Sequence, residues 1–186
     1  YIFYFILFIL SFLGNAKNVN CAEKITFYHG IMSRSISINK LEEFAKTNKA
    51  TGTIKNLIKL ANEDEDKIST FLNQEYEMPI VITSKLMNSK IGTVIIKRVS
   101  KFIYPDKTND SKISILAIRS GVIQGIYIGE GKINLIRFLK SYPNKNIAIN
   151  LASLNEVIYK AESMNDLVEF FTNEPFEKLK KPSSNS

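Results

Sequence analysis

The sequence is poor in the residues on which most catalytic and metal centres depend. Its 186 residues include one cysteine, Cys21, one histidine, His29, and no tryptophan. A single cysteine excludes a disulfide within the chain and a cluster of cysteine metal ligands. The Gly-x-Ser-x-Gly elbow of serine hydrolases, the phosphate-binding glycine loop and the calcium-binding loop are also missing. We therefore predict no catalytic residues, no metal site and no cofactor in this chain.

Arginine is scarce as well, with four residues against 21 lysines. The guanidinium group offers a planar fork of donors that lysine cannot imitate, so the four positions are candidates for bidentate contacts. Arg34 precedes a predicted helix, and we expect it either to clamp backbone carbonyls or a carboxylate at this corner or to be a chance retention. His29 is in phase with Ile25 and Phe27 of a predicted strand, which indicates a partly buried, hydrogen-bonded side chain.

The chain is basic, with a net charge of +7 and a pI of about 9.4. No nucleic-acid-binding motif accompanies this charge, so we predict no nucleic-acid partner. An acidic zone, residues 63–77, is followed by a basic zone, residues 85–119. Lys90, Lys97 and Lys101 share one side of a predicted helix and form a candidate basic surface. This layout suits a partner surface or anionic lipid headgroups, and it also suits two ordinary helix faces.

The chain opens on an apolar run, from Tyr1 to Leu13, which has the length of a signal-peptide core. It is shorter than the roughly 20 residues that cross a bilayer comfortably. The segments GNA, which ends at Ala16, and NCA, which ends at Ala22, are candidate cleavage sites. We therefore predict that residues 1–22 are a signal peptide or an N-terminal anchor and that the domain is exported.

The remaining pattern predicts a mainly α fold. Apolar residues at helical spacing indicate about eight helices around one core, in a single domain over residues 23–171. Period-two alternation adds a small two- or three-stranded β element near residues 24–29, 35–38 and 146–151. The first and last of these strands are expected to pair. A polar tail, residues 172–186, is expected to be disordered.

Several local features refine this prediction. Asn39, followed by Glu42 three residues later, predicts a capping box at the start of a helix. Gly121, Gly125 and Gly129 are spaced by four in a long apolar segment and predict a smooth strip for the close approach of another helix. The residues expected to be buried in two further helices are Ile68, Phe71 and Leu72, and then Ile91, Ile95, Val99 and Phe102.

The stretch AEKITFYHGIMSRSISINKLEEFAKT resembles the opening of a cyanobacterial domain of unknown function. That family's pattern runs Ala-Glu, a strand, Gly, Arg-Ser-Ile-Ser-Val, a Leu-Glu-x-Phe-Ala helix and Thr-Gly. Here Ile38 replaces the Val, and Asn48 replaces the last Gly. Later blocks, among them AIRSGVIQG and NLIRFLKSYPNKNIAINL, extend the likeness over roughly residues 22–160. The matching residues of the opening are Ala22, Glu23, Gly30, Arg34, Ser35, Ile36, Ser37, Leu41, Phe44 and Ala45.

The resemblance implies a domain that follows a signal peptide and typically precedes an α/β-hydrolase domain, which is not part of this chain. It implies an exported accessory domain of the periplasm or thylakoid lumen, without a catalytic triad of its own. It assigns no catalytic residues. The structural motif comprises Gly30, Arg34, Ser35, Ser37, Asn39 and Glu42.

Three functions are open at this point. The first is an exported accessory or binding domain whose partner is a hydrolase domain or another exported protein. The second is a fragment of an α/β hydrolase, of the serine esterase or lipase class, that lacks its catalytic domain and is an enzyme only together with it. The third is a membrane-associated interaction module that keeps its apolar N-terminal segment and places the Lys90, Lys97 and Lys101 side on lipid.

Overall fold

The computed structural model describes residues 21–61, 63–108 and 110–153. Helices cover most of these residues, so the prediction of a mainly α fold with a small β element is confirmed. The N-terminal apolar run, the last expected helices and the polar tail lie outside the described residues. The strands are β1 Lys24–His29, β2 Met32–Ser37, β3 Tyr76–Glu77, β4 Ile103–Pro105, β5 Lys132–Ile133 and β6 Asn146–Asn150. The helices are α2 Ile38–Thr47, α3 Gly52–Ala61, α4 Glu65–Asn73, α5 Ile80–Asn88, α6 Lys90–Val99, α7 Ser111–Ile128 and α8 Leu135–Ser141.

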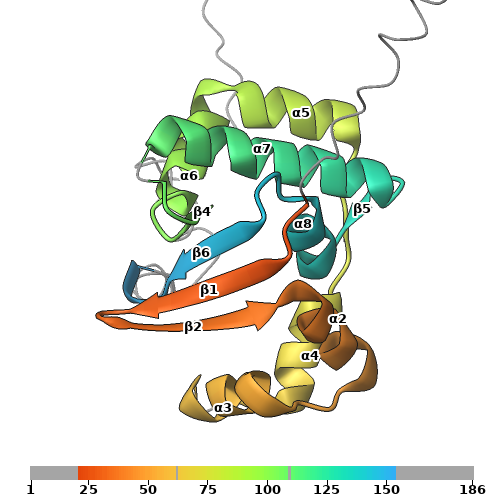
Figure 1. Cartoon of the computed structure of the whole chain (residues 1–186). Coiled ribbons are helices and arrows are strands. Elements are labelled where there is room, and N and C mark those ends of the chain that lie inside the picture. Colours follow the sequence, from red (N-terminus) through yellow and green to blue (C-terminus); the bar gives the residue numbers. More distant parts are fainter. Residues whose placement is uncertain (1–20, 62, 109, 154–186) are drawn as a thin grey trace, which may run out of the picture.

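The main sheet is mixed and has the strand order β2-β1-β6-β4 (Figure 1). Strands β1 and β2 form an antiparallel hairpin, and Gly30 turns it with a φ of 58°, which glycine adopts without strain. Strand β1 pairs in parallel with β6, placing Ile25 opposite Ile147, so the predicted pairing of these distant segments is confirmed. Strand β4 pairs antiparallel with β6 at the other edge. It was not predicted because it is short and ends on Pro105, a residue that sheets accept at their edges.

Strand β2 passes directly into helix α2 without a side-chain cap. The N-cap residue is Ser37, and its side chain makes no capping hydrogen bond. The N–H of Ile38 instead donates to the carbonyl of Glu23, just before β1, at 2.9 Å. This main-chain bond satisfies a donor that is otherwise free at a helix start. The predicted capping box of Asn39 and Glu42 is therefore wrong.

The end of helix α2 is fixed by Asn48, which takes a left-handed φ of 54°. Its N–H donates to the carbonyl of Phe44 at 2.8 Å. Asparagine adopts this conformation more readily than most residues, which explains why it stands where the resembled family has glycine. The side chain of Asn48 also donates to Asp66, so the end of α2 is joined to the start of α4.

Helix α8 packs closely against α7 at two glycines. A Cβ at Gly121 would lie 3.1 Å from the ring of Phe138, and one at Gly125 would lie 3.5 Å from the Cα of Phe138 and 3.0 Å from Ile133 of β5. The predicted close approach of a neighbouring helix is therefore confirmed for these two residues. Gly129 differs, because it is the C-cap of α7 and lies beside the turn that leads to β5.

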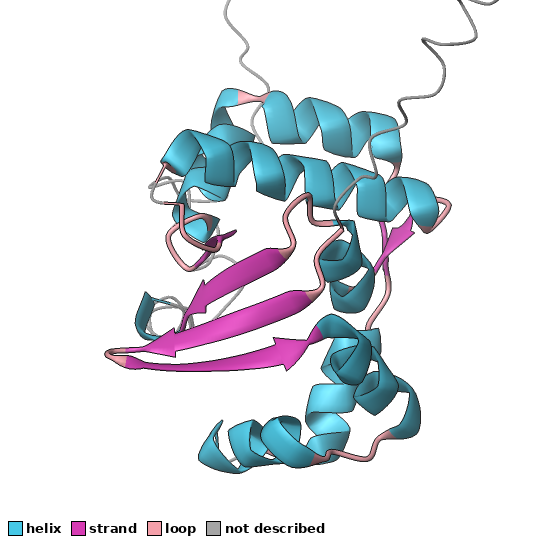
Figure 2. Cartoon of the chain, viewed as in Figure 1, coloured by secondary structure: helices cyan, strands magenta, loops and turns pink. Residues whose placement is uncertain are grey.

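The helices form two groups at opposite edges of the main sheet, as Figure 2 shows. We call α2, α3 and α4, which lie along β2, the β2-side helices, and α5, α6 and α7, which lie beyond β6 and β4, the β4-side helices (Figure 1). Helix α8 contacts both groups. One core runs through the molecule, with Phe44 and Leu72 from the first group and Ile96 and Ile118 from the second. None of the helices in the described part of the chain has the length and hydropathy needed to cross a bilayer.

Candidate interaction surface

The β4-side helices carry apolar side chains on their outward sides as well as on their buried sides. In helix α7, Ala117 and Ile118 are buried, whereas Ile113, Leu116 and Tyr127 are 48%, 62% and 68% exposed. A helix that is apolar all round is normally covered all round, by its own protein or by a partner. The exposed apolar residues of the three helices are Val81, Ile82, Leu86, Ile91, Val94, Ile113, Leu116, Tyr127 and Ile128.

The charged residues of helices α5, α6 and α7 are all positive. Helices α5, α6 and α7 contain no aspartate or glutamate. The ion pairs found between described residues involve none of the exposed lysines of these helices and of the turn after α6. Lys90, Lys97 and Lys101, the candidate basic surface, are among them, and their binding role stays a prediction. With the nine apolar residues, the β4-side surface comprises Lys85, Lys90, Lys97, Lys101 and Lys112.

Helices α5 and α6 touch main chain to main chain. A Cβ at Gly92 would lie only 1.9 Å from the carbonyl oxygen of Leu86. Ser89 joins the two helices, because its hydroxyl donates to the Leu86 carbonyl at 2.7 Å and accepts from the Gly92 N–H at 3.0 Å. Since Gly92 faces α5, Ile96 is buried one turn later and Ile91 is 40% exposed. The predicted buried stripe of this helix is therefore wrong at Ile91, whereas Val99 packs against the core as predicted.

Arg119 ties α7 to the other two β4-side helices. Its Nε donates to the carbonyl of Met87 at 2.9 Å, and a terminal nitrogen donates to the hydroxyl of Thr93 at 2.6 Å. Arg137 uses its fork in a similar way and contacts Glu75 at 3.2 Å, which joins α8 to the segment after α4. The scarcity of arginine was the sequence signal for both contacts. The β4-side surface thus lies on helices that are held firmly to one another.

An open apolar groove of about 260 Å³ lies between α4, α5, α7 and α8. Phe71 forms part of it and is 59% exposed, so the prediction that Phe71 is buried is wrong. Ser69 and Leu72 are the buried residues of α4, because this helix turns them toward α2. The groove is lined by Phe71, Tyr76, Met78, Met87, Val122, Ile133, Asn134, Leu135 and Phe138.

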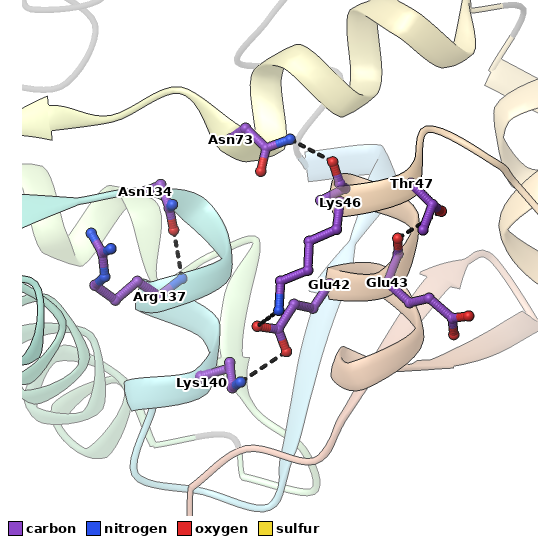
Figure 3. A network of polar contacts seen from close by, with 9 residues as sticks. Glu42, Glu43, Lys46, Thr47, Asn73, Asn134, Arg137 and Lys140 are labelled. Carbon is purple, nitrogen blue, oxygen red and sulfur yellow. Dashed lines mark hydrogen bonds and ion pairs between the residues drawn. The ribbon is translucent and has the colours of Figure 1, made fainter.

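A larger groove of about 1120 Å³, lined by both polar and apolar groups, borders α2 and α8. Within it, Glu42 lies between Lys140 at 2.8 Å and Lys46 at 3.0 Å, whereas Glu43 points away (Figure 3). The hydrogen bonds from Lys140 and then from Lys46 hold the pKa of Glu42 below its ordinary value. These cations are engaged with a carboxylate of the protein itself. The contacts therefore join α2 to α8, and Glu42 has this role in place of the predicted cap.

The remaining residues of the predicted structural motif do not gather into one site. The hydroxyls of Ser35 and Thr26 form a hydrogen bond of 3.0 Å across the hairpin. Arg34 is exposed, and its hydrogen bond among the described residues is a 3.4 Å contact with the carbonyl of Ser33. Arg34 therefore forms no bidentate clamp among the described residues, and the alternative of a chance retention stays open. His29 is also exposed, at the end of β1, rather than partly buried.

Comparison with known proteins places the chain in a family. No curated protein matches it, and no solved structure matches it. A family model does match, over residues 21–150, which is more than half of the chain and ends at the last residue of β6. The resemblance to a domain of unknown function associated with α/β hydrolases is thereby confirmed, whereas the cyanobacterial source and the place before a hydrolase domain stay predictions. The chain belongs to the family described as "Alpha/beta hydrolase of unknown function (DUF1400)".

Proposed function

We propose that this chain is an exported accessory domain that acts by binding and leaves bond cleavage to a separate α/β-hydrolase domain. The observation that carries the proposal is the β4-side surface. There, apolar side chains of three helices face outward on a firm scaffold with no carboxylate among them. Exposed apolar groups gathered on one face of a protein mark interaction sites.

The family description supports a link with hydrolase chemistry, and the fold supports placing that chemistry outside this domain. The main sheet has a single parallel pair, β1 with β6. An α/β hydrolase presents its serine on a nucleophile elbow at the top of a mostly parallel sheet. His29, the one histidine of the chain, is exposed at the hairpin end. If the chain is a fragment of a longer hydrolase, the same binding role serves the catalytic domain within one polypeptide.

The export component of the proposal rests on the apolar run from Tyr1 to Leu13 and on the candidate cleavage sites at Ala16 and Ala22. The expected destination is the periplasm or the thylakoid lumen. The mass of the mature N-terminus, measured on protein from fractionated cells, tests this component. A mature chain that begins just after Ala16 or Ala22 is the expected result, and an intact leader on cytosolic protein contradicts export.

Site-specific photo-cross-linking in producing cells tests the binding component. A cross-linking side chain is placed at Leu116 on α7, and the control carries it at Lys55 on α3, which is also exposed. We expect adducts with lipid or with one identified exported protein at position 116 and none at position 55. The purified chain is expected to show no esterase turnover. Equal adducts at both positions, or turnover that a single serine substitution abolishes, contradict the proposal.

A further inference from the structure

We propose that the β4-side surface docks on an anionic lipid bilayer, an inference that rests on the binding role proposed above. The charge of the surface is complementary to that of anionic lipid headgroups. Helices α5, α6 and α7 carry lysine and arginine but no carboxylate, and the five lysines of the surface take part in no ion pair among the described residues. Anionic headgroups attract each lysine near the membrane by about 1 kcal/mol, which is about fivefold in affinity.

The composition of the surface also favours a lipid partner. Protein–protein interfaces are enriched in aromatic residues, methionine and arginine, and they are depleted of lysine. The β4-side surface instead carries eight aliphatic residues, one aromatic residue, Tyr127, and five lysines, and the other exposed polar residues of the same helices are all neutral, namely Asn88, Ser111, Ser120 and Gln124. Aliphatic side chains enter the acyl region, while lysine stems lie along it and carry their ammonium groups up to the headgroups. This combination fits a bilayer better than it fits a folded partner.

The arrangement of the two kinds of residue favours a bilayer as well. On α6, Lys90, Val94 and Lys97 follow one another at helical spacing, so one stripe combines an apolar group with cations, and the exposed Lys101 lies in the turn just after the helix. Leu116 and Ile113 lie one turn apart on the outward side of the adjoining helix α7. Because no described helix is suited to crossing a bilayer, the three helices would lie in the plane of the interface.

The absence of tryptophan allows a direct test on the full chain. The variant Leu116→Trp places a single tryptophan on the surface, and Lys55→Trp places one on α3 as the control. We expect the emission of the first to shift to shorter wavelength with vesicles of equimolar phosphatidylcholine and phosphatidylglycerol. We expect no shift with phosphatidylcholine alone or with inorganic phosphate, and none for Lys55→Trp in any mixture. No shift at position 116, or an equal shift at position 55, overturns the inference.

Two matched triple variants distinguish binding through the β4-side surface from binding through net charge or through the apolar N-terminal run. Both variants retain that run. In the Leu116→Trp chain, Lys90→Gln, Lys97→Gln and Lys101→Gln together should weaken binding to the mixed vesicles about a hundredfold. Lys49→Gln, Lys55→Gln and Lys59→Gln remove the same charge elsewhere and should weaken it less than about threefold, because salt screens distant charges. Equal losses overturn the inference.

The accessory role is tested separately by the cross-links described above. A protein adduct at position 116 without a vesicle-induced shift rejects the bilayer and leaves the accessory role standing. If neither an adduct nor a shift is observed, both proposals fail.

Discussion

The two groups of helices at the edges of the sheet contribute to the same core, but they face solvent in different ways. On the β2 side, charges of both signs are present and contact one another, as in Glu42 with Lys46 and Lys140. On the β4 side, the exposed positions carry apolar groups, lysines and a few neutral polar side chains, and none of them carries a carboxylate. Burial therefore does not distinguish the two groups. The chemistry of their exposed sides distinguishes them, and the proposed binding role rests on this difference.

The difference also shows in how each group is held together. The β2-side helices α2 and α4 are joined through side chains, some exposed, as in the contact of Asn48 with Asp66, and some buried, as in the bond from the Ser69 hydroxyl to the Ala45 carbonyl. The β4-side helices are joined by a main-chain contact at Gly92 and by Arg119, both beneath the outward apolar residues. An exposed apolar surface gains no free energy from packing on its outer side. The helices that carry it must therefore be held in place by contacts on their inner side. This contrast can be tested with matched substitutions.

The largest difference is expected from the same truncation in the two groups. Leu72 on α4 is 4% exposed, whereas Leu116 on α7 is 62% exposed. Leu72→Ala should lower the free energy of unfolding by about 2–5 kcal/mol, because it removes buried methyl groups and leaves a cavity. Leu116→Ala should change it by less than about 0.5 kcal/mol. Chemical denaturation followed by far-ultraviolet circular dichroism measures both, and equal losses would mean that α7 is already covered in solution.

The second prediction concerns the support under the β4-side surface. Gly92→Ala should destabilise the fold by about 3 kcal/mol, because the new Cβ would meet a backbone carbonyl that cannot rotate away. Gly30→Ala is the control, since a Cβ there meets no atom within 4 Å and the cost is limited to its left-handed φ. That cost is about 1 kcal/mol. Similar losses in thermal denaturation for the two variants would contradict the main-chain contact between α5 and α6.

The third prediction concerns Tyr142, which is fully buried at the end of α8 and packs edge-to-face on Phe138 at 5.8 Å. Its hydroxyl has no hydrogen-bond partner among the described residues, and burial raises the pKa of Tyr142. Tyr142→Phe should therefore stabilise the protein, by about 1 kcal/mol. Tyr28→Phe is the control of opposite sign, because the Tyr28 hydroxyl donates to Asp106 at 2.9 Å. Destabilisation by Tyr142→Phe would indicate a partner for that hydroxyl.

Local pattern was enough to predict most of the fold. Strands near 24–29 and 146–151 and their pairing were predicted from period-two alternation, and the second of them ends at Asn150. The exposure of Ile91 on α6 could not be predicted, because the contact between Gly92 and Leu86 sets it and no periodicity records that contact. The strands β3, β4 and β5 were missed because two or three residues are too few to show a period.

The candidate surface was predicted only in part. Lys90, Lys97 and Lys101 are all exposed, but helix α6 ends at Val99, so Lys101 lies in the turn after it and the binding role of the three stays a prediction. The apolar part was missed because the sequence does not distinguish an isoleucine that is buried in the core from one that is exposed on the surface. The available signal was the run from residue 78 to residue 105, which contains no carboxylate. Such a run removes the charge alternation that normally marks the solvent side of a helix.

The smallest expected effect concerns the ion pairs of the β2 side and depends on pH. The folded protein holds the pKa of Glu42 below its ordinary value of 4.5, so these contacts stabilise the fold fully above that pH. The stabilisation is lost as the pH falls through the lowered pKa. Glu42→Gln should therefore lower the melting temperature by about 1–3 °C at neutral pH, as expected for an accessible pair, and leave it unchanged in acid. Glu43→Gln is the neighbouring control, because Glu43 points away from both lysines (Figure 3). A similar loss for both variants at neutral pH would show that general charge, rather than the bridge from α2 to α8, stabilises this side of the molecule.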